Sequence, residues 1–241
     1  MKVIESCRVM YPYTRVPILL KHAVWSKEYR KVIVFMHGSQ GFGKVTLFYL
    51  RLLAQLGFLV IAPDHVTSHV QCLDMISYKS TIQKACSTKN QNTYRYIVQY
   101  RLMEIRKCMH FIETHMPHAT VSLAGTSEGA IAVARSRANV HSKLLLSYVA
   151  QPSYFSPQMK LLHVKEGSSV VIIHGANDEY FGSTNSVSSQ TKHKCGGKGH
   201  VYKHKSAIHT HILKNTGHNI TPTQEHRNVI THIVTKHFGC T

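Results

Sequence analysis

The chain has 241 residues, of which 43% are apolar and 17% are charged, and this composition excludes a disordered or low-complexity protein. The length suits one domain over residues 1–241. The net charge of +18 predicts attraction to polyanions or to an anionic substrate. Because the basic residues are spread along the chain, without an aromatic-plus-basic signature, we expect no specific nucleic-acid recognition.

The chain shows no feature of a membrane-inserted or secreted protein. None of its apolar runs approaches the roughly 20 residues needed to span a bilayer, so we expect no membrane span. Glu5 and Arg8 stand where a secretion signal needs its apolar centre. The six cysteines are scattered in a chain large enough to fold without cross-links, so we expect reduced thiols. We therefore expect a cytoplasmic protein, either a monomer or a homodimer.

Short apolar runs alternate with amphipathic segments along the chain, which is typical of a mostly parallel sheet with helices on both faces. The predicted fold class is therefore a three-layer α/β/α sandwich. Strands are predicted at 32–36, 58–62, 120–124, 144–149, 169–174 and 209–214. The segments 64–94 and 182–207 have weak periodicity and are predicted as loops or short irregular elements.

Three helices are predicted between these strands. The first covers 45–56 and ends at Gly57. The second covers 95–116 and carries one apolar stripe, formed by Val98, Leu102, Ile105, Met109, Ile112 and Met116. The third is predicted near the C-terminus, with Thr221 as its cap, Pro222 at its first position and Gln224 three residues beyond the cap. Its inner face is predicted to contain Val229, Ile233 and Val234.

The glycine-rich stretch VIVFMHGSQGFGKVT, residues 32–46, is close to a nucleotide-binding loop. Such a loop needs G-x-x-x-x-G-K followed by Ser or Thr, whose hydroxyl holds Mg²⁺. Gly38 and Lys44 fit the pattern, but Val45 stands where the hydroxyl is needed. Thr46 comes one residue too late, about 100° further round a helix. Asp64 could imitate the second metal-binding motif, so nucleotide binding by the 38–46 loop stays an alternative.

A second glycine-containing motif decides between these interpretations. Residues 125–129 read Gly-Thr-Ser-Glu-Gly, a G-x-S-x-G pattern between a predicted strand and a helix start. The glycines permit a sharp turn that leaves the Ser127 hydroxyl exposed as a nucleophile. The motif requires an acid after a later strand, and then a histidine near the C-terminus.

The acid and the histidine can both be assigned from chain order. Asp178 follows the strand 169–174, with Glu179 as the alternative acid, whereas the other two aspartates precede Ser127. His218 lies between the last strand and the last helix. The remaining C-terminal histidines fall within the predicted strand or helix, and are His209, His211, His226, His232 and His237. The sequence thus predicts a catalytic triad of Ser127, Asp178 and His218 at the carboxyl ends of strands.

In these motifs the chain resembles the α/β-hydrolases over roughly residues 30–238, and is most similar to their dienelactone-hydrolase-like branch. It departs from that branch in one respect, because dienelactone hydrolases typically use a cysteine nucleophile. The resemblance implies an oxyanion hole whose first donor is the backbone N–H of Ser39, or of Gln40 if the turn is built differently. The second donor is expected to be the N–H of Glu128.

The expected activity is that of a serine hydrolase that cleaves a small carboxylic ester or thioester through an acyl-enzyme, without a cofactor. Only about 18 residues follow Val149 before the next strand, so no separate cap domain is expected. A peptidase is disfavoured, and a catalytically silent binding protein on the same fold stays an alternative. Four residues with metal-ligand chemistry lie in a lysine-rich stretch at non-standard spacing, so no metal is expected there: His193, Cys195, His200 and His204.

Overall fold

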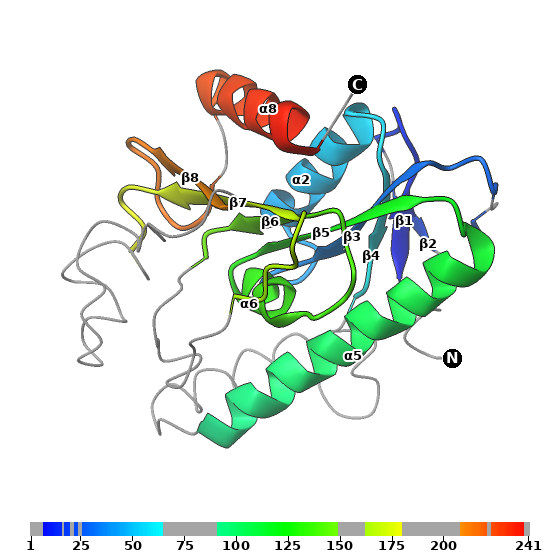
Figure 1. Ribbon diagram of the computed structural model, residues 1–241. Helices are drawn as coiled ribbons and strands as arrows, with labels where there is room; N and C mark the ends of the chain where they lie inside the picture. Colours follow the sequence, from blue (N-terminus) through cyan, green and yellow to red (C-terminus); the bar gives the residue numbers. More distant parts are fainter. Residues whose placement is uncertain are drawn as a thin grey trace.

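An eight-stranded sheet organises the chain in the computed structural model (Figure 1). The structure describes residues 7–15, 17–19, 22–23, 26–64, 91–148, 162–179, 208–220 and 223–238, with the backbone alone for 91–96. The strand order is β2-β1-β4-β3-β5-β6-β7-β8. All neighbouring strands from β4 to β8 are parallel, whereas β1 is antiparallel to both β2 and β4.

The six predicted strands are all present, with small shifts at their ends. They are β3 (Lys31–Met36), β4 (Leu59–Ala62), β5 (Thr120–Thr126), β6 (Ser142–Leu146), β7 (Ser169–Gly175) and β8 (Ile208–Leu213). Two short strands, β1 (Arg8–Met10) and β2 (Ile18–Leu19), were not predicted. Three and two residues are too few to show the alternation that marks a strand in sequence.

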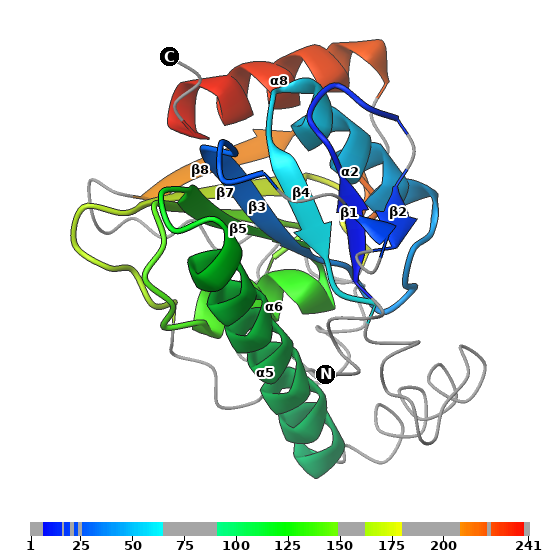
Figure 2. The same ribbon diagram turned by 90° about the vertical axis from the view of Figure 1, so that its right-hand side faces the viewer.

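Helices cover both faces of the sheet, which confirms the three-layer arrangement. Helices α5 (Gln91–His115) and α6 (Glu128–Arg135) lie on one face, and α2 (Lys44–Gln55) and α8 (Gln224–Phe238) lie on the other (Figures 1 and 2). Helix α5 begins four residues earlier than predicted, inside the predicted 64–94 loop. The rest of that loop beyond Asp64, and the whole 182–207 loop, lie outside the described residues. No helix in the described part of the chain is long and apolar enough to cross a membrane.

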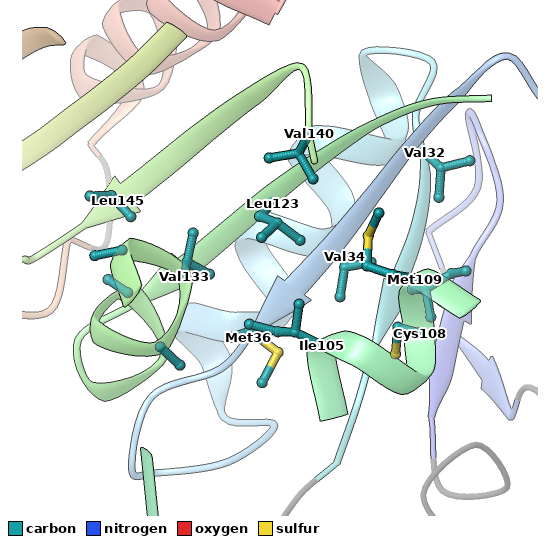
Figure 3. Packing of buried hydrophobic residues seen from close by; sticks show 14 of the residues in the cluster. Val32, Val34, Met36, Ile105, Cys108, Met109, Leu123, Val133, Val140 and Leu145 are labelled. Atoms are coloured by element: carbon teal, nitrogen blue, oxygen red, sulfur yellow. The ribbon is translucent and has the colours of Figure 1, made fainter. Parts of the chain in front are cut away.

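The apolar stripe on α5 packs against the sheet as its spacing predicts. Figure 3 shows Ile105 and Met109 of α5 beside valines of β3 and side chains of β5 and α6. All members of the predicted stripe are buried except Leu102, which is partly buried against the same cluster. Each fully buried side chain of this kind stabilises the fold by about 1.5–3 kcal/mol.

The helix ends show one confirmed and two corrected predictions. Gly57 follows α2 with a φ of +85°, the left-handed conformation expected of a helix-terminating glycine. Helix α8 begins at Gln224, and the hydroxyl oxygen of Thr223 accepts the His226 N–H at 3.3 Å, so Thr223 is the cap. The predicted cap Thr221 and the following Pro222 lie outside the described residues. Val229 is 40% exposed and is not on the inner face, because the buried face is centred one residue further on, at Ile230.

Candidate active site

The predicted nucleophile Ser127 lies at a strained turn between β5 and α6. Its φ of +52° and ψ of −119° form a conformation that is rare for a residue with a side chain. A Cβ on Gly125 would lie 2.7 Å from the Gly129 backbone, and a Cβ on Gly129 would lie 2.1 Å from the Met36 carbonyl oxygen. Only glycine fits at these two positions, so the G-x-S-x-G spacing is required by close backbone packing.

The loops after β7 and β8 bring Asp178 and His218 to the same end of the sheet. The N–H of Asn177 donates to the Thr216 carbonyl at 2.9 Å, which joins the two loops. A Cβ on Gly175 would lie 2.4 Å from the Gly217 carbonyl oxygen, so the loops also approach too closely for any larger residue there. This contact holds Asp178 beside His218.

The side chains of Ser127, His218 and Asp178 form one hydrogen-bonded chain. His218 Nε2 lies 2.8 Å from Ser127 Oγ, and His218 Nδ1 lies 2.8 Å from Asp178 Oδ2. Asp178 is fully buried, whereas Ser127 remains 9% exposed. Because a carboxylate only accepts hydrogen bonds, the Nδ1–H donates to Asp178 and leaves Nε2 to accept the serine hydroxyl proton.

The alternative acid, Glu179, contacts His218 in a different way. Its Oε2 accepts the backbone N–H of His218 at 2.9 Å, so it fixes the main chain and not the imidazole ring. On the other side of His218, the hydroxyl of Ser147 donates to its carbonyl at 2.5 Å. The geometry therefore assigns the ring contact to Asp178 and gives Glu179 a supporting position.

A second histidine, His174 on β7, lies beside the same aspartate. Its Nδ1 is 3.8 Å from Asp178 Oδ2, and the residue is only 2% exposed. Burial lowers the pKa of His174, whereas the neighbouring Asp178 carboxylate acts in the opposite direction. The motif order does not single out His174, although this residue stands in the same HGANDE segment as Asp178.

The predicted oxyanion donors come from two segments that border Ser127. Ser39 and Gln40 lie in a turn after β3, closed by a 3.2 Å hydrogen bond from the Gly41 N–H to the Gly38 carbonyl. A Cβ on Gly38 would lie 3.5 Å from the Ser127 Cβ, so this turn passes directly beside Ser127. Glu128 is the first residue of α6 and is buried.

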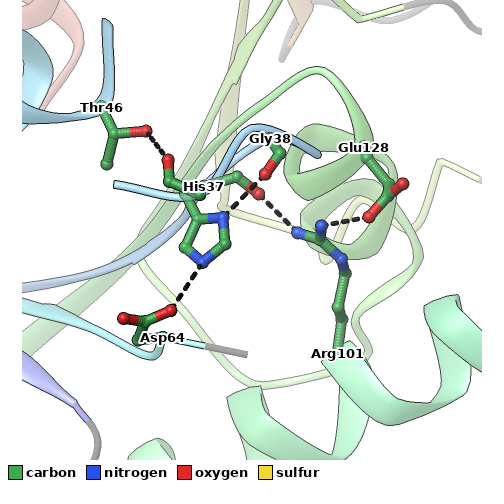
Figure 4. A network of polar contacts seen from close by, with 7 residues as sticks. His37, Gly38, Thr46, Asp64, Arg101 and Glu128 are labelled. Atoms are coloured by element: carbon green, nitrogen blue, oxygen red, sulfur yellow. Dashed lines mark hydrogen bonds and ion pairs between the residues drawn. The ribbon is translucent and has the colours of Figure 1, made fainter. Parts of the chain in front are cut away.

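A buried charged network lies behind these two segments (Figure 4). The Arg101 guanidinium on α5 donates to the His37 carbonyl at 2.5 Å and to the Glu128 carboxylate. The His37 ring is fully buried, with Nε2 3.7 Å from Asp64 Oδ1. Burial lowers the pKa of His37, and the Asp64 contact opposes this shift. Because a carbonyl oxygen only accepts hydrogen bonds, His37 Nδ1–H donates to the Gly38 carbonyl at 2.7 Å.

The arrangement of the 38–46 loop disfavours the nucleotide-binding alternative. Thr46, which stands nearest the position of the metal-binding hydroxyl, is 3% exposed and donates to the Gly41 carbonyl at 2.8 Å. Asp64, the proposed second metal-binding residue, pairs with His37. The loop packs against the Ser127 turn.

Three other C-terminal histidines make contacts of their own within the described residues. His209 on β8 and His237 on α8 stack with their ring centroids 4.1 Å apart, at the edge of the sheet. His226 Nε2 lies 3.3 Å from the Thr216 hydroxyl. Across the described ranges, no group of three or more His, Cys, Asp or Glu residues could hold a metal ion. The stretch that contains His193, Cys195, His200 and His204 lies outside those ranges.

The sequence matches no protein-family model and no curated protein. Several solved structures nevertheless share the fold over nearly the whole chain. An α/β serine hydrolase without a lid, from Xanthomonas campestris, matches with a TM-score of 0.60 at 16% identity, over 98% of this chain and 90% of that one. A serine hydrolase homologue from Coxiella burnetii matches with a TM-score of 0.54 at 11% identity, over 95% and 89% of the two chains.

A dienelactone hydrolase-like promiscuous phosphotriesterase from metagenomic libraries matches with a TM-score of 0.52 at 15% identity, over 96% of this chain and 99% of that one. At these low identities, what the comparisons establish is the fold. The chain has the α/β-hydrolase fold and is similar in structure to serine hydrolases and dienelactone hydrolase-like proteins.

Proposed function

We propose that this chain is a serine hydrolase that cleaves a carboxylic ester or thioester, with Ser127 as nucleophile, His218 as general base and Asp178 as the residue that orients the imidazole. The observation that supports this proposal most directly is the chain of two 2.8 Å contacts from Ser127 through His218 to Asp178. The nucleophile, the base and the orienting acid are thus within hydrogen-bond reach in the order that activation of a serine requires.

The reaction follows from the positions of these groups. His218 Nε2 removes the Ser127 hydroxyl proton as Oγ attacks the acyl carbonyl carbon, and the N–H groups of Ser39 and Glu128 hold the resulting oxyanion. The tetrahedral intermediate expels the alcohol or thiol, which takes its proton from His218. A water molecule then attacks the acyl-enzyme with His218 again as base, and this step releases the carboxylic acid and restores Ser127.

Other features favour an active enzyme over a silent binding protein. The strained conformation of Ser127 and the buried Asp178 are costly for a fold that has no use for them. The structural neighbours are named as serine hydrolases or hydrolase-like proteins, which is consistent with the same chemistry. The departure from the cysteine nucleophile of dienelactone hydrolases favours a more general ester or thioester substrate.

The proposal is tested with p-nitrophenyl esters and acyl thioesters of graded chain length. We expect hydrolysis by the wild-type protein and a decrease of about 10⁴-fold or more in Ser127→Ala. Ser122→Ala is the matched control, because Ser122 is also on β5 but pairs with the Ser142 hydroxyl at 2.9 Å inside the sheet. Equal rates for Ser127→Ala and wild type, or no turnover of any ester or thioester by the folded wild type, would contradict the proposal.

A further inference from the structure

We infer that Arg101 is a positioning residue that holds together the two segments of the oxyanion hole. This inference rests on the proposed function. The Arg101 side chain is fully buried on α5, and its two terminal nitrogens contact different segments. One donates to the carbonyl oxygen of His37 after β3, and the other donates to the Glu128 carboxylate at the start of α6 (Figure 4).

The two groups that Arg101 binds, the His37 carbonyl and the Glu128 carboxylate, lie next to the two proposed oxyanion donors. His37 precedes the turn that contains Ser39, and Glu128 supplies the second donor through its own N–H. These segments follow the neighbouring strands β3 and β5, whose pairing ends at Met36 and Gly125. The bonds of Arg101 lie just beyond the end of this pairing, at His37 and Glu128. The guanidinium is planar and rigid, and by binding both segments it fixes their relative position.

The turn that contains Ser39 is held by its carbonyl oxygens. Arg101 binds the His37 carbonyl, the His37 ring binds the Gly38 carbonyl, and Thr46 binds the Gly41 carbonyl. In a planar trans peptide the N–H points opposite to the preceding C=O. The bonds to the Gly38 carbonyl therefore set the direction of the Ser39 N–H, and the Arg101 bond fixes the peptide immediately before it.

Arg101 also acts through its charge. A carboxylate on Glu128, the residue whose N–H is proposed to bind the oxyanion, opposes the negative charge that develops on the substrate oxygen. In a buried setting such repulsion is weakly screened. The Arg101 guanidinium neutralises this carboxylate directly, so the N–H of Glu128 can stabilise the oxyanion without interference from its own side chain.

Packing alone does not explain an arginine at this position. Arg101 falls three residues after Val98 and four before Ile105, on the apolar stripe of α5 where an apolar residue would fill the space. Buried ion pairs can often be replaced by apolar residues with little loss of stability, or with a gain. A role in positioning the His37 and Glu128 segments, and in neutralising the Glu128 carboxylate, accounts for a buried arginine at this position.

The test uses Arg101→Met, Arg101→Lys and the double variant Arg101→Met/Glu128→Gln. We expect Arg101→Met to lower kcat by about 10²-fold while KM changes less than about threefold, because oxyanion contacts form in the transition state. The affinity for a trifluoromethyl ketone, whose adduct places an oxyanion in the hole, is expected to fall by a similar factor. Arg101→Lys restores part of the loss, since it keeps the charge. The double variant also recovers part of it, because the uncompensated carboxylate is gone.

Lys143→Met is the matched control. Lys143 is also a buried cation, but it donates to the carbonyls of Ser136 at 2.7 Å and His163 at 2.8 Å, beyond the C-terminal end of α6. Its loss is expected to leave kcat and ketone affinity within about twofold of wild type. If Arg101→Met does not fold, folded Arg101→Lys is used for the same measurements. Its expected decreases in kcat and in ketone affinity are smaller than those of Arg101→Met.

The outcomes separate this inference from the proposed function. If the wild type shows Ser127-dependent turnover but the folded Arg101 variants keep wild-type kcat and ketone affinity, the inference is wrong and the proposed function stands. A loss that only tracks the folded fraction, without a change in ketone affinity per folded molecule, also overturns it. If the wild type shows no Ser127-dependent turnover, the proposed function itself is wrong and the inference fails with it.

Discussion

The two halves of the candidate site are built by different means. The half around Ser127, called the nucleophile half, lies in the middle of the sheet, where glycines at 125 and 129 allow close backbone packing. Arg101 of α5 binds the two segments beside it. The other half, with Asp178 and His218, lies at the ends of β7 and the edge strand β8. There, hydrogen bonds between two loops position the side chains.

Because the two halves are held separately, the fold keeps Ser127 in a strained conformation and places His218 within hydrogen-bond distance of it. Strain at Ser127 persists only because the surrounding backbone leaves no room to relax. His218 needs no such strain, since the Asp178 carboxylate and the Glu179 carboxylate hold its ring and its backbone separately. We therefore expect substitutions in the acid–base half to act on chemistry, and those in the nucleophile half to act on stability as well.

The largest effect is expected in the acid–base half. Asp178→Asn should lower kcat by about 10⁴-fold, because an amide can donate to His218 Nδ1 and stabilise the wrong tautomer. Glu179→Gln should change kcat by less than about fivefold, since the amide oxygen still accepts the His218 N–H. Ester hydrolysis by the two variants checks this difference. A larger loss in Glu179→Gln than in Asp178→Asn would reverse the assignment of the acid.

In the nucleophile half, Gly129→Ala should destabilise the fold by about 3 kcal/mol, because the new methyl group meets the Met36 and His37 carbonyls. Gly43→Ala is the control, since a Cβ there finds its nearest neighbour at 3.9 Å and Gly43 has an ordinary extended conformation. Urea unfolding of both variants measures the difference in the free energy of unfolding. Equal stability of the two would show that the elbow is not tightly packed.

Backbone strain at Ser127 itself predicts a smaller effect. Ser127→Gly should be more stable than Ser127→Ala by about 1 kcal/mol, because glycine adopts a φ of +52° without a steric penalty. Both variants lack the hydroxyl, so their activities should be equally low. Thermal unfolding monitored by circular dichroism compares the two. An alanine variant as stable as the glycine variant would remove the argument for stored strain.

The smallest effect concerns the sheet edge next to the acid–base half. Burial, together with His209, His211, Lys236 and His232, lowers the pKa of His237 to about 4. The folded state thus binds this proton less readily than the unfolded state, in which the histidine pKa is about 6.5. The neutral ring contributes its stability fully above about pH 6.5, and that contribution is lost as the pH falls towards 4.

His237→Gln should therefore reduce the decrease in melting temperature between pH 7.5 and pH 5, while activity at pH 7.5 stays within about twofold of wild type. Thermal melts at both pH values measure this change. His22→Gln is a control that removes a histidine from the N-terminal part of the chain, far along the sequence from this edge. An unchanged melting-temperature difference in His237→Gln would show that the β8 edge does not govern the acid sensitivity.

Much of the architecture could be predicted from the sequence because its signals are local. Buried parallel strands appear as short apolar runs, and α5 has a regular stripe. Strands β1 and β2 are too short to give such a signal. Val229 was misplaced because its apolar character suggested the inner face of α8, although the packing is centred on Ile230.

The residues proposed for the triad could be chosen because their motif demands a fixed order along the chain. The structure brings Ser127, His218 and Asp178 together at hydrogen-bond distances. Arg101 and His37 belong to no motif with a fixed order along the chain, so they could not be chosen in this way. Each contacts a backbone carbonyl, which has no sequence signal, and a carboxylate distant in sequence. A charged residue on the apolar stripe of α5 was the one sequence signal that pointed to Arg101.

The most direct test of the central claim is the reaction of the purified protein with a fluorophosphonate, followed by measurement of the intact mass. An activated Ser127 predicts a single adduct on the wild type, with displacement of fluoride by Oγ, and no adduct on folded Ser127→Ala. The absence of an adduct on the folded wild type, or an adduct that persists in Ser127→Ala, would contradict the account of this site as that of a serine hydrolase.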